Sequence, residues 1–130
     1  MNASLDGAAH FVRDTLGCGC SAELLSRIAM AEEPRILAGM PVRFALNVGG
    51  RLLVCVTDET ADLESRMEAI LEAGRSARDA GGFHRFRLVV AADPHGGVRE
   101  RLAGAFDRAG NRDDRMHLHV VAPADLDWGS

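Results

Sequence analysis

The chain contains no lysine and no tyrosine, so all fifteen of its basic residues are arginine. Without lysine there is no amine for a Schiff base, no phosphate-loop lysine and no lysine general base. Aromatic residues make up only 5% of the chain, and the strand face that carries Arg85 and Arg87 lacks the interleaved aromatics on which nucleic-acid bases stack. These absences exclude lysine-dependent enzymes and disfavour nucleic-acid binding.

Long hydrophobic runs are also absent. No apolar stretch approaches the roughly 20 residues that span a bilayer, and residues 1–7 have neither the basic start nor the apolar run of a secretory signal. The net charge of −4 and the isoelectric point near 5.7 give no overall field that attracts nucleic acid or an anionic membrane. We therefore expect a cytoplasmic protein that binds neither.

Cysteine is scarce as well, with three residues in the chain. Without an export signal, we expect these thiols to be reduced rather than paired in disulfides. The length of 130 residues, with 47% hydrophobic and 26% charged residues, is enough for one hydrophobic core. The sequence therefore predicts a single domain that spans residues 1–130.

Four segments have apolar residues spaced three to four apart, which is typical of a helix with one buried face. They are residues 5–16, a second segment that buries Ile28, residues 60–79 and residues 97–109. Gly17 follows the first segment, and glycine readily takes the left-handed conformation that ends many helices. The sequence thus predicts four helices, the first of which ends at Gly17.

Four other segments are typical of strands. Residues 42–48 alternate apolar and smaller or polar residues, and residues 51–57 follow them after Gly49-Gly50, which predicts a β-hairpin. Residues 86–92 and 116–121 are two further apolar strands, each preceded by a predicted helix. Strands joined through a helix run parallel.

These elements follow one another in the order α-α-β-β-α-β-α-β. We expect an α/β fold with a mixed four-stranded sheet, in which the antiparallel hairpin is extended by parallel strands. Helices should cover both faces of this sheet, and the strands should lie side by side in their chain order.

The most reactive side chains lie close together in the stretch Leu16-Gly17-Cys18-Gly19-Cys20-Ser21, which holds two of the three cysteines. Cys20 lies just before a predicted helix, whose free N–H groups favour a thiolate. Cys18 and Cys20 are therefore a candidate thiol-redox pair or metal site for zinc or an iron–sulfur cluster, although two thiolates do not complete such a site. A symmetric homodimer, or a nitrogen from His10 or His84, would complete it. The competing interpretation is that both cysteines pack in a tight corner between helices.

A second candidate site lies where the parallel strands end, the edge at which α/β proteins bind ligands. Asp58 follows the second strand, and Asp93 and His95 follow the third. The two carboxylates are candidate ligands for Mg²⁺, with His95 as a base. The alternative interpretation is that both aspartates only cap helices.

Two pairs of basic residues share a strand face because they lie two residues apart. His117 and His119 form one pair, and Arg85 and Arg87 form the other. Because no third ligand is evident, we expect the histidines to be half-exposed positions on an edge strand.

The order of elements is similar to that of the cytidine deaminase-like fold, whose enzymes carry H-x-E and P-C-x-x-C at the starts of two crossover helices. Here these positions read Asp58-Glu59-Thr60 and Pro94-His95-Gly96-Gly97, so the resemblance implies the fold without the zinc ligands or the activity. Residues 11–20, which end in Leu-Gly-Cys-Gly-Cys, resemble the opening of a group of small uncharacterised prokaryotic proteins, which implies no activity.

Two functional hypotheses follow. The leading one is a small cytoplasmic accessory or binding protein that uses Cys18 and Cys20, as a homodimer or with a protein partner. The alternative is a small metal-assisted hydrolase that acts through Asp58, Asp93 and His95.

Overall fold

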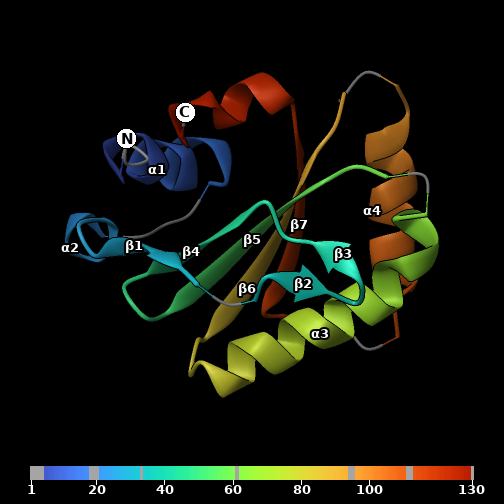
Figure 1. The fold of residues 1–130 in the computed structure, drawn as a ribbon, viewed down its shortest axis with the longest axis horizontal. Helices are drawn as coiled ribbons and strands as arrows, with labels where there is room; N and C mark the ends of the chain where they lie inside the picture. The colour runs from blue at the N-terminus through green and yellow to red at the C-terminus, as the bar shows by residue number, and fades with distance from the viewer. Residues whose placement is uncertain are drawn as a thin grey trace.

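The computed structural model describes residues 5–17, 21–32, 34–60, 62–93, 96–110 and 113–129, and its centre is a five-stranded mixed sheet (Figure 1). The strands, in their order across the sheet, are β1 (Ile28–Ala31), β4 (Phe44–Val48), β5 (Leu52–Asp58), β6 (Arg85–Ala91) and β7 (Met116–Val121). β1, β4 and β5 are antiparallel neighbours, whereas β5, β6 and β7 run parallel. The predicted mixed sheet and its parallel crossovers are confirmed, but the sheet has one more strand than predicted.

Helical segments cover both faces of the sheet (Figure 1). One face packs against α3 (Met67–Ala80) and α4 (Val98–Arg108). The other face packs against α1 (Leu5–His10), the π-helical segment η1 (Phe11–Thr15) and the 3₁₀ segment η3 (Pro123–Gly129). The sheet thus separates two hydrophobic cores.

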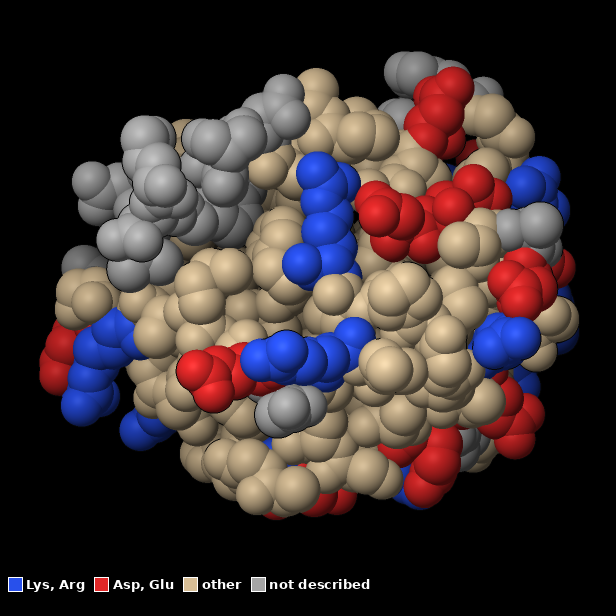
Figure 2. Space-filling view, viewed as in Figure 1, with Lys and Arg blue, Asp and Glu red and all other residues tan. Residues whose placement is uncertain are grey.

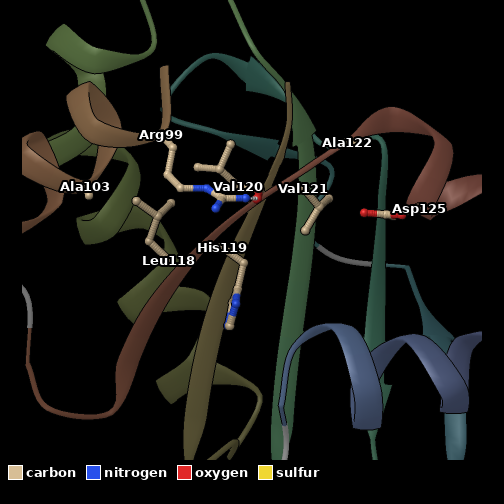
Figure 3. A pocket seen from close by; sticks show the side chains of 8 residues that line it. All are labelled: Arg99, Ala103, Leu118, His119, Val120, Val121, Ala122 and Asp125. Carbon is tan, nitrogen blue, oxygen red and sulfur yellow. Dashed lines mark hydrogen bonds between the residues drawn. The ribbon is translucent and has the colours of Figure 1, made fainter. Parts of the chain in front are cut away.

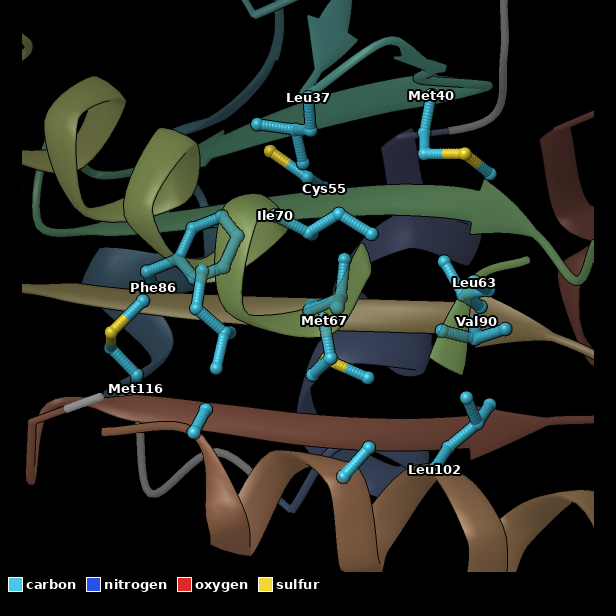
Figure 4. Close-up of a cluster of buried hydrophobic side chains, with 14 of the residues drawn as sticks. Leu37, Met40, Cys55, Leu63, Met67, Ile70, Phe86, Val90, Leu102 and Met116 are labelled. Atoms are coloured by element: carbon cyan, nitrogen blue, oxygen red, sulfur yellow. The ribbon is translucent and has the colours of Figure 1, made fainter. Parts of the chain in front are cut away.

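The two cores arise from alternation along the buried strands. In β5, Leu53 and Cys55 belong to the core under α3 and α4, whereas Val54 and Val56 belong to the opposite core. Figure 4 shows Cys55 among the side chains of the first of these cores. A strand that is buried on both faces has few polar positions, which is why β5 and β6 are so apolar.

The second predicted helix is the main correction to the fold. The helix α2 covers only Ala22–Leu25, and Ile28 lies in β1, opposite Val48 of β4. The Ser26 hydroxyl donates a hydrogen bond of 2.6 Å to the Glu23 carbonyl, which helps to end the helix after one turn. The next residues then satisfy the open edge of β4 with backbone hydrogen bonds, which a longer helix would leave unpaired.

Two smaller differences concern other predicted segments. The long helix α3 begins at Met67 rather than at residue 60, because a turn and the 3₁₀ segment η2 (Glu64–Arg66) come first and bury Leu63. The connector before β4 contains a short hairpin of β2 (Ile36–Leu37) and β3 (Met40–Pro41). The end of the first helix is as predicted, since Gly17 has a φ of 68°.

Candidate functional site

Asp58 and Asp93, two of the three candidate residues of the strand-end site, lie at the same edge of the sheet, as their parallel strands require. Asp58 is the last residue of β5 and pairs in register with Ala91 of β6, two residues before Asp93. The Asp58 side chain is 66% exposed and is 3.3 Å from a guanidinium nitrogen of Arg43. Asp93 is also exposed. Asp58 therefore already has a cationic partner.

Cys18, Cys20 and the predicted base His95 all lie outside the described residues, whereas His10 and His84, the candidate nitrogen ligands, are exposed. Within the described ranges, no three His, Cys, Asp or Glu side chains are placed to hold a metal ion together. The third cysteine, Cys55, is fully buried, and burial raises the pKa of its thiol to about 12. Cys55 is therefore not a reactive thiol, in agreement with its position in an apolar strand.

A cluster of polar side chains from β6 and β7 lies beside Leu16, two residues before Cys18 in the chain. Arg87 of β6 lies on the sheet face that packs against α1 and η1. Its Nη1 donates to the carbonyl oxygen of Leu16 at 2.9 Å, and it is 2.8 Å from Nε2 of His119 on β7. Leu16 is the residue with which the first helical stretch ends. One guanidinium nitrogen therefore joins this helix end to β7.

His117 and His119 are half-buried on the same face of β7, and Arg87 is the cross-strand neighbour of His117. Because Arg87 is always a donor, Nε2 of His119 accepts the hydrogen bond, so the ring proton is on Nδ1. Burial, followed by Arg87 and His117, lowers the pKa of His119 to about 4. Burial, Arg87 and Arg85 also lower the pKa of His117. Both imidazoles are therefore neutral at pH 7.

The charge of this cluster is unbalanced. No carboxylate in the part of the chain that the structure describes pairs with Arg87, and burial together with Arg85 lowers the pKa of the Arg87 guanidinium. Nε of Arg87 and Nε2 of His117 are both buried and have no hydrogen-bond partner among these residues. A half-buried cation without a counter-ion is costly. The cluster therefore favours a negatively charged neighbour.

Sequence reasoning found these residues but not their connection. The prediction that His117 and His119 are half-exposed positions on an edge strand is confirmed, since β7 ends the sheet. The hydrogen bond from Arg87 to Leu16 joins residues 71 positions apart, so no local sequence pattern predicts it. The signal that was available is that Arg87 and both histidines lie on the same face of neighbouring strands.

On the face that Figure 2 shows, arginines and acidic residues are interspersed rather than gathered into one basic or acidic area. Such mixing is typical of a solvated surface.

No helix in the described part of the chain is both long enough and apolar enough to cross a membrane. Comparisons with protein-family models, with curated proteins and with solved structures found no match to this chain. Its function is therefore argued from the site alone.

Proposed function

We propose that this chain is a small accessory or binding protein that holds a soft metal ion through the thiolates of Cys18 and Cys20. The observation that carries the proposal is the hydrogen bond from Arg87 to the carbonyl of Leu16. It fixes the chain two residues before Cys18, against a strand face with a positive charge and two neutral imidazoles. Two residues of chain reach at most ~7 Å.

The charge of the cluster supports a role for thiolates. A cation close to a cysteine favours its thiolate over its thiol, and the thiolate is the form that binds metal. Arg87 has no acidic partner among the described residues, so its charge is available to do this. Arg87 itself is not a ligand, because a guanidinium has no free lone pair.

The histidines favour zinc over an iron–sulfur cluster. Zinc sites commonly combine two thiolates with two imidazoles, whereas most clusters take four thiolates. His117 and His119 are neutral at pH 7, which ligation requires. Nε2 of His117 already has no partner in the described part of the chain. His119 would exchange its hydrogen bond with Arg87 for the metal.

The test is metal analysis of protein purified without oxygen, together with its absorption spectrum. We expect about one zinc ion per chain and no cluster absorption. The double variant Cys18→Ser with Cys20→Ser should lose the metal, and Cys55→Ala should keep it, because that thiol is buried in the core. His117→Ala should weaken zinc binding, whereas His84→Ala, an exposed histidine before β6, should not.

Metal-free wild-type protein that takes up no zinc would refute the zinc proposal. If Cys18 and Cys20 then react with a thiol reagent far faster than a model thiol at pH 7, the thiol-redox form of the proposal is the one to keep. Slow labelling would assign both cysteines to packing.

The alternative of a metal-assisted hydrolase has weaker support. Asp58 and Asp93 follow neighbouring strands, but the exposed Asp58 carboxylate already pairs with Arg43. The variants Asp58→Asn and Asp93→Asn should therefore leave the zinc content unchanged. The cytoplasmic location remains part of the proposal, because reduced thiols persist in that compartment.

A further inference from the structure

The outer edge of β7 offers backbone groups that no neighbouring strand uses. The N–H groups of Phe86 and Ala92 donate to the carbonyls of Arg115 and Val121, so the odd-numbered residues of β7 face β6. The backbone groups of Leu118 and Val120 therefore point away from the sheet. Nη2 of Arg99 reaches the Val120 carbonyl from α4 at 3.1 Å, which confirms this direction.

A hollow of about 360 Å³ runs along this edge (Figure 3). Its floor is the strand segment Leu118–Val121, and Ala103 of α4 and Ala122 line its sides. Two exposed charged residues flank it, with Arg99 on the α4 side of the sheet and Asp125 in η3 on the opposite side. The hollow thus combines strand backbone that no other strand pairs with, one carbonyl of which already accepts from Arg99, and one charge of each sign.

We propose that a second copy of this chain docks its own β7 into this hollow, antiparallel, with Leu118 opposite the partner's Leu118. Identical strands that pair around a two-fold axis must run antiparallel. In this register Val120 lies opposite the partner's Met116. Residues whose backbone N–H and C=O groups point away from β6 therefore face one another across the interface. The two sheets would then form one continuous sheet of ten strands.

The charges next to β7 match in this register. The residue just before the strand is Arg115, which is exposed. Its carbonyl accepts a hydrogen bond from the N–H of Phe86, so Arg115 continues the odd-numbered face of β7, the side of the sheet on which η3 lies. There it would approach the partner's Asp125. The two-fold axis doubles this contact to two pairs of opposite charge.

The match also selects the register. A shift of the partner by two residues keeps the outward-facing groups opposite one another, but it moves each charge by about 7 Å along the strand. The pairs of opposite charge are then lost. The proposed register also sets His117 across from the partner's His119 on the shared face. This inference does not rest on the metal proposal, because no cysteine takes part in it.

Pairing along one edge buries a modest area, so we expect a dimer with a dissociation constant in the micromolar range. Sedimentation of the full chain between roughly 1 and 200 µM, with a chelator present, measures it without any contribution from metal. Asp125→Arg and Arg115→Asp should each weaken the dimer at least about fivefold, through like charges on both sides of the axis. The double variant, which swaps the charges, should restore wild-type affinity.

Two further variants complete the test. Arg51→Asp makes the same charge change as Arg115→Asp in the turn between β4 and β5, and it should not alter the affinity. Leu118→Pro removes an outward N–H and spares the ladder to β6, so the protein should be monomeric with unchanged circular dichroism. A wild-type protein that stays monomeric at about 200 µM would overturn the proposal. So would a charge swap that fails to restore a dimer weakened by the single changes.

Discussion

The ion pair between Arg78 and Asp113 yields the most direct stability prediction. Arg78 lies in the last turn of α3, and its side chain is only 2% exposed although it is charged. Nη1 and Nη2 lie 2.9 Å from the two carboxylate oxygens of Asp113, and Nε lies 3.0 Å from Asp79. Asp113 also accepts a hydrogen bond from the N–H of Arg115, just before β7. The pair therefore fastens the end of α3 to the start of β7.

We expect Arg78→Met to lower the free energy of unfolding by about 2–4 kcal/mol. Removal of one partner of a buried pair costs about 3–5 kcal/mol, but the Asp113 side chain is 30% exposed and regains some hydration. In a chain of 130 residues this corresponds to a fall in Tm of about 10 °C. Urea unfolding at pH 7, followed by circular dichroism, measures the change.

The double variant Arg78→Met with Asp113→Asn tests whether the loss comes from the pair. It should cost less than the sum of the two single changes, because no uncompensated charge remains. Additive losses, or a single-variant loss below about 0.5 kcal/mol, would refute the reasoning. The bond with Arg78 lowers the pKa of Asp113 below its usual value of 3.8. Wild-type protein should therefore lose this stabilisation as the pH falls below about 4, and Arg78→Met should show no such loss.

Two other predictions concern packing and pH. Gly74→Ala should destabilise the protein by about 1–3 kcal/mol, because the added Cβ would lie 2.5 Å from the Phe86 ring; Gly104→Ala meets only a flexible arginine and should be neutral or slightly stabilising. Between pH 7 and pH 5, metal-free wild-type protein should lose about 2 kcal/mol of its free energy of unfolding through His119, and His119→Gln should not show this part of the loss. The pKa of His119 is about 4 when folded and about 6.5 when unfolded, so the unfolded state alone gains the proton, whereas glutamine still accepts from Arg87. Equal pH dependence in variant and wild type would contradict this.

The central strands could be predicted because a strand that is buried on both faces is a nearly continuous run of apolar residues. β5 contains six consecutive buried residues, Leu52–Thr57, a pattern that no other element in the described part of the chain has. β1 could not be predicted in the same way. It has four residues, and the spacing of Leu24, Leu25 and Ile28 also fits a helix. The open edge of β4 decided between the two, and that edge exists only in the folded sheet.

The candidate site illustrates the same limit. The sequence showed Cys18 and Cys20 as a pair and His117 and His119 as another, but nothing in their spacing related the two pairs. Arg87 joins His119 to Leu16, two residues before Cys18 in the chain, and it does so through a backbone carbonyl, an atom that every residue has. Residues that act through such contacts are recognised from a structure only.

The burial of Cys55 makes it a probe of motion in the sheet. Its side chain lies between β4 and β6 in the ladder, under α3, and is fully enclosed. A thiol reagent can reach it only when this part of the sheet opens, so the slow phase of labelling reports the free energy of that opening. Labelling of the wild-type chain can therefore measure local opening of the sheet without an engineered cysteine.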